Sequence, residues 1–253
     1  MQNVATPLYM DWSFWAVVIA FAALVLSQVP PIHVMLKRAK IDLELYSKIS
    51  ITHKLGNPNL QLHLILNNIG GRRVRVKDIK VSISKDGTHL VNLPAQNYLQ
   101  NQNDQNTVLF TTFALDPKDE WAHITNFLNF FSRDDEKAYQ KIEGDLLTDF
   151  RSHQKEMKGE GNQEEFYEHP NELVQPAFNF FEKHFCWNAG EYNMSVIVTT
   201  DSKSADVVKN YRFTIFESHT ETLSAIKEHF KYGGGLYWNP KIQTSVILEV
   251  TEA

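Results

Sequence analysis

The pattern of hydrophobic and polar residues divides the chain into an apolar first segment, two stretches of alternating hydrophobicity and, between these, a stretch with helical spacing. Alternation with a period of two is typical of half-buried strands, and apolar residues three or four positions apart are typical of amphipathic helices. The pattern therefore predicts a mainly β fold with an α insertion, preceded by a separate N-terminal helix.

The first apolar segment covers residues 12–29, and none of residues 12–36 is Asp, Glu, Lys or Arg. A helix of this length would extend about 27 Å, close to the hydrocarbon thickness of a bilayer. Aromatic residues near its start suit the headgroup level, and Pro30 and Pro31 would end the helix. We therefore expect a single-pass transmembrane helix with its exit within 12–36, preceded by an extracytoplasmic tail at 1–11.

The charges around this segment predict its orientation. Lys37, Arg38 and Lys40 follow it directly, whereas Asp11 is the one charged side chain before it. The positive-inside rule then places the N-terminus outside and the large domain in the cytoplasm. The alternative is a cleaved signal peptide, which normally starts with a positively charged stretch, and residues 1–10 contain no Lys or Arg.

Residues 37–116 form the first predicted β half. Alternating apolar positions mark strands at 41–46, 60–67, 74–83 and 107–115. A one-residue shift in the alternation predicts a bulge near Lys77 and Asp78. The Asp-Gly pair at 86–87 predicts a turn, and the polar residues 97–106 predict a loop.

Residues 117–185 form the predicted helical insertion. Apolar residues at helical spacing mark three amphipathic helices at 121–131, 139–150 and 174–185. Residues 155–169 are rich in Glu, Lys and Gly, with few apolar residues. This composition predicts a mobile loop between the second and third helices.

Residues 186–253 form the second predicted β half. Alternation marks strands at 192–198, 211–215 and 244–250, and a shorter helix is expected over 220–230. The stretch Ala-Gly-Glu-Tyr-Asn-Met at 189–194 resembles the tyrosine corner of immunoglobulin-like domains, in which Gly-x-Tyr is followed two residues on by a core position. The resemblance implies an immunoglobulin-like β-sandwich interrupted by amphipathic helices.

Composition and charge exclude several classes of protein. With 43% hydrophobic residues the chain is not disordered as a whole, and the single cysteine excludes an internal disulfide framework. The net charge is −5 and the pI is about 6.1, so no overall positive field exists that would hold a nucleic acid. No nucleic-acid partner is expected.

Reactive side chains occur, but not in a recognised pattern. Cys186 follows His184 by two positions, and no second cysteine or third ligand stands at a metal-binding spacing. Asp119, Glu120 and His123 lie near a predicted helix start, where acidic residues are favoured without any catalytic role. We therefore expect no catalytic residue, no metal site and no cofactor.

The densest basic stretch follows a pair of glycines and contains Arg72, Arg73, Arg75 and Lys77. Exposed glycine amides beside arginines could hold a phosphate or an anionic headgroup. No P-loop or dinucleotide pattern surrounds the stretch, and a hairpin turn with solvated basic residues is the simpler interpretation.

Tyr237 and Trp238 follow three glycines, at 233–235, in the connection to the last strand. Flexible glycines beside aromatic side chains are common in recognition loops, so this segment is a candidate partner-binding loop. The two aromatic residues could equally cover the open end of the sandwich as a hydrophobic latch.

Together these features favour a non-enzymatic, membrane-tethered protein-binding or scaffold module at the cytoplasmic face. A tether raises the effective concentration of a membrane partner and allows homo-oligomers to form. The alternative is a membrane-bound sensor or effector of a defence or stress system that binds a phosphate-bearing ligand through the basic hairpin. A third hypothesis, a hydrolase using Cys186 with His184 or His123, has the least support.

Overall fold

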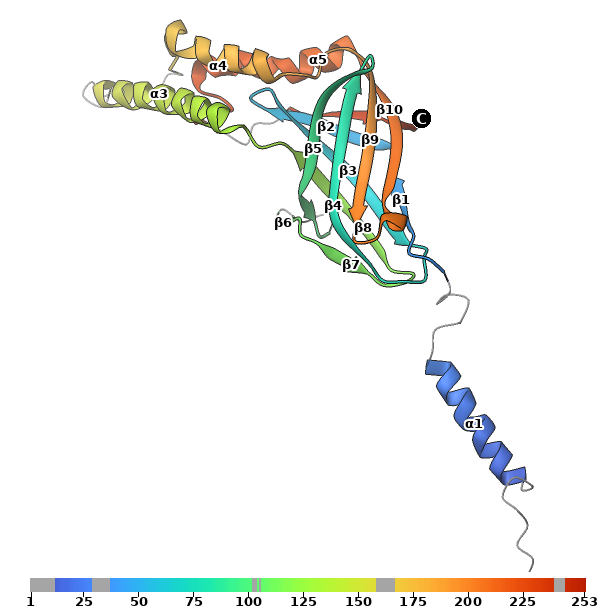
Figure 1. Cartoon of the computed structure of the whole chain (residues 1–253). Coiled ribbons are helices and arrows are strands. Elements are labelled where there is room, and N and C mark those ends of the chain that lie inside the picture. The colour runs from blue at the N-terminus through green and yellow to red at the C-terminus, as the bar shows by residue number, and fades with distance from the viewer. Residues whose placement is uncertain (1–11, 29–36, 102–103, 105, 158–166, 239–243) are drawn as a thin grey trace, which may run out of the picture.

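A curved antiparallel sheet, a layer of helices at one end of it and a separate N-terminal helix make up the fold (Figure 1). The computed structural model describes residues 12–28, 37–101, 104, 106–157, 167–238 and 244–253. The helices are α1 (Trp12–Gln28), α3 (Arg133–Met157), α4 (Asn171–His184), α5 (Glu217–Ser224) and the 3₁₀-helices η2 (Lys203–Ala205) and η3 (Ala225–Tyr232). The strands are β1 (Ile41–Leu45), β2 (Lys48–Lys54), β3 (Asn57–Asn68), β4 (Val74–Lys85), β5 (Thr88–Leu99), β6 (Thr107–Leu109), β7 (Phe113–Leu115), β8 (Glu120–Leu128), β9 (Gly190–Thr200), β10 (Val207–Ile215), β11 (Val246–Glu249) and β12 (Thr251–Glu252).

The strands form a sheet that nearly closes on itself. Its order is β11-β2-β3-β8-β5-β4-β9-β10-β12, with β1 beside β3, β6 beside β5 and β7 beside β4. Strand β5 pairs with β4 through residues 88–94 and with β8 through residues 95–99. The register of the second pairing shifts between Ala95 and Asn97, and such an irregularity lets a strand bend. Strand β5 therefore turns the corner between the two halves of the sheet.

The C-terminal segment links the two ends of this sheet. Strand β11 pairs with β2, β12 pairs with β10, and Val250 lies between the two strands. The N–H of Val250 donates to the carbonyl oxygen of Ser47 at 2.9 Å, and the N–H of Ala253 donates to that of Asn210 at 2.9 Å. Because an edge strand leaves backbone groups unpaired, this segment covers edges that would otherwise be exposed.

The interior of the sheet is filled by the side chains that alternate along its strands. Leu62 and Leu64 of β3 and Phe127 of β8 have no exposed surface. Trp187, just before β9, is also fully buried, and its indole N–H donates to the carbonyl oxygen of Thr52 at 2.7 Å. The main core therefore follows the period-two pattern of the sequence.

The stretch that resembles a tyrosine corner forms the hydrogen bonds typical of that feature. The Tyr192 hydroxyl lies 2.6 Å from the carbonyl oxygen of Asn188 and 2.8 Å from that of Cys186. Its ring stacks on Phe213 at a centroid distance of 5.1 Å. The immunoglobulin-like pairing of two sheets nevertheless stays a prediction, because β5 joins both halves into one nearly closed sheet.

Helices α3, α4, α5 and η3 lie across the end of the sheet opposite to the chain's entry at residues 37–40 (Figure 1). Their own apolar cluster includes Leu146, Phe181 and Phe230. His53 of β2 joins the two layers, since its Nε2 lies 2.7 Å from the carbonyl oxygen of Leu223. Packing, as well as covalent connection, therefore fixes this layer on the sheet.

The predicted helix at 121–131 is wrong, because this segment forms strand β8. Trp121, Thr125 and Phe127 alternate toward the interior, and β8 pairs with β3 on one side and β5 on the other. The same apolar residues also stand at helical spacing, so periodicity alone could not decide between the two structures. The predicted insertion at 117–185 therefore begins with a strand, and its helices start at α3.

The bulge and the turn predicted in the first β half are present, whereas some strand boundaries differ from the prediction. The pairing of β4 with β9 shifts between Val76 and Asp78, which confirms the bulge. A turn connects β4 to β5 at residues 86–87, as predicted. Strands β2 and β5 were not predicted, and the expected strand at 107–115 is divided into β6 and β7.

The predicted helices at 139–150, 174–185 and 220–230 are confirmed as α3, α4 and the pair α5 and η3. The expected mobile loop at 155–169 starts later, because α3 continues to Met157. Its centre, 158–166, lies outside the described residues, so its mobility stays a prediction.

The N-terminal helix α1 has 17 residues and ends at Gln28. Every side chain described in it, from Trp12 to Ser27, is exposed. Among the described residues, no helix combines the length and the apolar character needed to cross a membrane. The predicted tail at 1–11 and the predicted exit at 29–36 lie outside the described residues.

Candidate functional site

Two basic segments that are distant in the sequence lie side by side where the chain enters the sheet. The N–H of Gly70 donates to the carbonyl oxygen of Lys40 at 3.1 Å, and the N–H of Gly71 donates to that of Arg38 at 3.3 Å. A Cβ atom on Gly70 would lie 2.5 Å from the backbone of Arg38 and of Lys40, so only glycine permits this approach. We call segments 37–40 and 69–77 together the basic end.

The predicted ligand-binding residues Arg72, Arg73, Arg75 and Lys77 are all exposed on the basic end. Arg73 Nε lies 3.7 Å from Asp116 Oδ1, and both of these side chains are more than 60% exposed, at 71% and 62%. Arg75 donates through Nη2 to a threonine hydroxyl at 2.8 Å. Within the described part of the chain, Arg72, Arg75 and Lys77 form no ion pair.

The glycine amides of this turn are engaged by the protein itself. The N–H of Gly70 also lies 3.0 Å from Asn68 Oδ1, and that of Gly71 is bonded to Arg38 as described above. A phosphate cradle needs backbone N–H groups that point at the ligand. The basic end therefore offers separate exposed cations rather than a preformed cradle for one phosphate.

The candidate partner-binding loop lies at the opposite end, beside the helices. The N–H of Trp238 donates to the carbonyl oxygen of Gly233 at 3.0 Å, and the N–H of Gly235 donates to that of Trp238 at 3.0 Å. The ring of Tyr237 packs over Gly233, whereas Trp238 is 45% exposed. The two predicted aromatic residues thus differ, because Tyr237 closes the loop and Trp238 faces outward.

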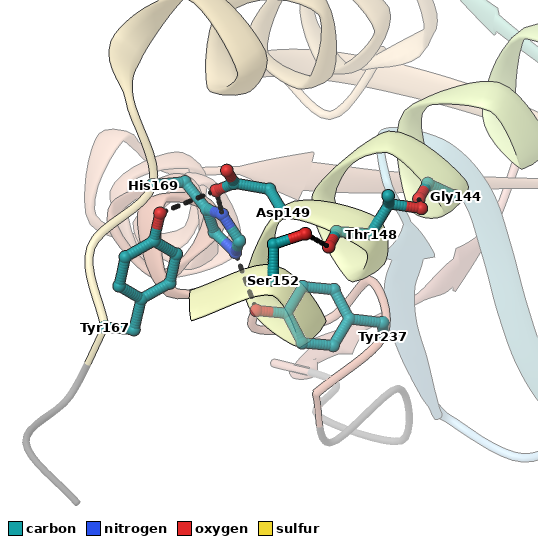
Figure 2. A network of polar contacts seen from close by, with 7 residues as sticks. All are labelled: Gly144, Thr148, Asp149, Ser152, Tyr167, His169 and Tyr237. Carbon is teal, nitrogen blue, oxygen red and sulfur yellow. Dashed lines mark hydrogen bonds and ion pairs between the residues drawn. The ribbon is translucent and has the colours of Figure 1, made fainter. Parts of the chain in front are cut away.

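Figure 2 shows a polar network around Tyr237 that the sequence did not suggest. His169 Nδ1 lies 2.7 Å from Asp149 Oδ2, and His169 Nε2 lies 2.6 Å from the Tyr237 hydroxyl. The Tyr167 hydroxyl donates to the same Asp149 oxygen at 2.8 Å. The network joins α3, the segment before α4 and the glycine loop.

The donors and acceptors of this network are assigned from its chemistry. The Asp149 carboxylate accepts, so His169 Nδ1 carries the proton of that bond, and the second hydrogen bond joins Nε2 to the Tyr237 hydroxyl. Burial alone would raise the pKa of Asp149, but hydrogen bonds from His169 and Tyr167 outweigh it and lower the pKa. Burial and the Asp149 charge raise the pKa of Tyr237 to about 12.

The order of carboxylate, imidazole and hydroxyl resembles the arrangement that activates a nucleophile. Such a role requires Tyr237 to lose its proton, which a pKa of about 12 opposes. The His169 side chain also has no exposed surface. The geometry therefore favours a network that positions the glycine loop on the helices.

The other reactive side chains are not brought together. His184 packs on Phe180 at a centroid distance of 4.5 Å and faces Asp135, whereas Cys186 packs against the main core. Burial raises the pKa of the Cys186 thiol to about 12, which opposes a nucleophilic thiolate. His123 bonds instead to the carbonyl oxygen of Leu99 at 3.1 Å.

Potential metal ligands do not gather in the described residues. In the parts of the chain that the structure describes, no group of three or more His, Cys, Asp or Glu side chains could hold a metal ion. The polar network has only Asp149 and His169 as potential ligands, and both are engaged in hydrogen bonds.

Comparisons with known proteins do not assign the chain to a family. No protein-family model matches it, and no curated protein and no solved structure matches it either. Function has therefore to be inferred from the residues and their geometry alone.

Proposed function

We propose that the chain is a membrane-tethered, non-enzymatic protein-binding module, attached through α1. The observation that carries this proposal is that α1 is apolar on all sides and uncovered, with Phe21 67% and Leu24 61% exposed. An exposed apolar surface of this extent marks contact with a partner or a membrane. Lipid fits better than a protein groove, because a groove covers only one face of a helix.

The length of α1 limits the form of this attachment. Its 17 residues extend about 26 Å, somewhat less than the hydrocarbon core of about 30 Å. Residues 29–36 add no charged side chain, and Lys37, Arg38 and Lys40 follow them. We expect α1 to anchor the chain with its N-terminus outside and the sheet in the cytoplasm, in agreement with the positive-inside rule.

The binding role is supported by the distance between the two ends of the sheet. The chain enters at the basic end, whereas the helices lie at the other end of the sheet (Figure 1). The exposed Trp238 follows Tyr237, which bonds to His169 beside these helices, so a protein partner could approach there. Tethering would raise the effective concentration of such a partner. Ala16, Ala20 and Ala23 lie at helical spacing in α1 and would allow close packing in a homo-oligomer.

The proposal includes an immunoglobulin-like arrangement of the strands. Its support is local, in the hydrogen bonds of Tyr192 to the backbone six and four residues upstream. A solved structure in which the β11-β2-β3-β8 half does not face the β4-β9-β10 half would contradict the immunoglobulin-like arrangement. It would not affect the proposed membrane attachment through α1.

The tether is tested with the full chain expressed with a C-terminal tag. We expect the chain to remain in the membrane pellet after alkaline carbonate washing, and the tag to be digested only when the cytoplasmic side is opened. Ala20→Asp places a charge at the centre of α1 and should release the chain, whereas the matched Ala20→Ile variant should be retained. Release of the unchanged chain by carbonate would overturn the proposal, and a mature mass lacking α1 would identify a cleaved signal peptide.

A further inference from the structure

Positively charged side chains are concentrated where the chain enters the sheet. The basic end contains seven cations and no carboxylate, although the whole chain has a net charge of −5. Two neighbouring turns, 116–119 and 201–206, add two lysines and four aspartates, so this region keeps a net charge of +5. Of these aspartates, Asp201 accepts from the N–H of Arg75 at 3.0 Å and Asp116 lies beside Arg73.

The basic end cannot lie far from whatever holds α1. Eight residues, 29–36, connect α1 to Lys37, and a chain of this length spans at most about 29 Å when fully extended. The entry segment is fixed to the sheet, because Ala39 is buried and its carbonyl oxygen accepts from the Ser204 hydroxyl at 3.2 Å. The orientation of the cations relative to the chain entry is therefore set by the fold.

The chemistry of the basic end suits a surface of phosphates better than one bound phosphate. The glycine amides of the turn are engaged, and the arginine side chains are exposed separately. Ile69 is 45% exposed in the same turn, immediately before the glycines. An exposed aliphatic side chain among arginines can enter the headgroup region while the cations contact lipid phosphates.

We propose that the basic end docks on the anionic headgroups of the bilayer that holds α1, with Ile69 inserted among them. This inference rests on the proposed function, because α1 must first bring the domain to the membrane. Docking would fix the orientation of the sheet and keep the helices and Trp238 away from the bilayer.

The test uses the full chain in nanodiscs, with single spin labels in a Cys186→Ala background whose fold is checked by circular dichroism. Labels replace Ile69 on the basic end, Leu24 on α1 and Phe216 at the helical end, where it is 56% exposed. The discs contain either phosphatidylcholine alone or phosphatidylcholine with phosphatidylserine. Access of each label to oxygen and to a water-soluble nickel chelate is measured by electron paramagnetic resonance.

We expect the Ile69 label to be shielded from the nickel chelate only in discs that contain phosphatidylserine. The shielding should be lost at an ionic strength of about 1 M, where the Debye length falls to about 3 Å. The Leu24 label should be in lipid in both kinds of disc, and the Phe216 label in water in both. A Leu24 label exposed to water would contradict the proposed function. A Leu24 label in lipid, together with an Ile69 label whose accessibility is the same with and without phosphatidylserine, would contradict the docking proposal alone.

Charge reversal identifies the side chains responsible. Replacing Arg72, Arg73 and Arg75 by Glu should abolish the shielding of the Ile69 label, since each cation contributes about fivefold to binding at an anionic surface. The matched control replaces Arg133, Lys137 and Arg151 of α3, which are also exposed, and should leave the shielding unchanged. Equal loss in both triple variants would show a general effect of net charge and overturn the assignment.

A free phosphate ligand is the competing explanation of the arginines. Saturable binding of pyrophosphate to the protein in phosphatidylcholine discs, lost in the triple arginine variant, would replace the docking surface by a ligand site. Absence of such binding, together with shielding by phosphatidylserine, is the result expected here.

Discussion

Single residues hold the glycine loop on the helices. His169 is fully covered and contacts both Asp149 and Tyr237, which are separated by 88 positions in the sequence. The Asp149 carboxylate accepts from both His169 and Tyr167, and the other ring nitrogen of His169 bonds to the Tyr237 hydroxyl. A buried network in which every member is satisfied specifies one arrangement of the elements that it joins.

Removing the carboxylate should loosen this arrangement. In Asp149→Ala, His169 and Tyr167 lose their common acceptor, and the free energy of unfolding should fall by about 1–3 kcal/mol. Asp145→Ala is the control, because its partner Lys141 is an exposed side chain of the same helix and the pair should contribute less than about 0.5 kcal/mol. Urea unfolding of both variants measures the difference.

The same carboxylate predicts a dependence on pH. The folded pKa of Asp149 lies below the value of an unfolded aspartate, so the unfolded chain binds its proton first as the pH falls. The stability that Asp149 provides is therefore complete above a pH of about 4 and is lost below it. The difference in the free energy of unfolding between the wild-type chain and Asp149→Ala should become smaller below this pH. A difference that increases in acid would contradict a lowered pKa of Asp149 in the folded chain.

At the scale of elements, close approaches of the backbone position the basic end. Strand β3 and the entry segment meet at Gly70, where no side chain fits. The bulge in β4 near Asp78 lies on the following strand, beside β9. The arginines are therefore presented by a turn whose shape depends on two elements that are distant in the sequence.

Adding one methyl group at this turn should detach the entry segment. Gly70→Ala would place a Cβ 2.5 Å from the backbone of Arg38 and Lys40, and the resulting shift should cost about 1–3 kcal/mol. Gly144→Ala is the matched control, because its Cβ meets no atom within 4 Å on helix α3. This control should gain about 0.5–1 kcal/mol, and equal effects of the two changes in urea unfolding would refute the packing argument.

For the whole molecule, closure of the sheet depends on its last residues. Strand β11 pairs with β2 and β12 pairs with β10, so the C-terminal segment contacts both ends of the strand order. Leu248 faces the core, whereas the adjacent Ile247 is 68% exposed. A short segment thus completes a core whose other strands come from the entire chain.

Neighbouring substitutions in β11 test this contribution. Leu248→Ala should lower the free energy of unfolding by about 2–5 kcal/mol, because it leaves a cavity between the ends of the sheet. Ile247→Ala, on the outer face, should change it by less than about 0.5 kcal/mol. Chemical unfolding followed by tryptophan fluorescence gives both values, and similar losses would show that the segment does not close the core.

The sequence by itself determined the local features that depend on neighbouring residues. Alternation identified β1, β3 and β4, the parity shift identified the bulge, and the apolar segment identified α1. Helical spacing identified α3 and α4, since amphipathic helices carry their pattern within themselves. The stretch that resembles a tyrosine corner is local as well, because the hydrogen bonds of Tyr192 reach only six residues upstream.

Tertiary structure alone decided the features that depend on distant partners. The apolar residues of strand β8 fit both the helical period and the strand period, so the sequence pattern could not decide between the two structures. Pairing with β3 and β5 selected the extended form. No local signal joined Asp149, His169 and Tyr237, since nothing in each residue's surroundings specifies the others. The basic end likewise depends on the contact of Gly70 and Gly71 with the backbone of Arg38 and Lys40, which required the fold to place two separate segments side by side.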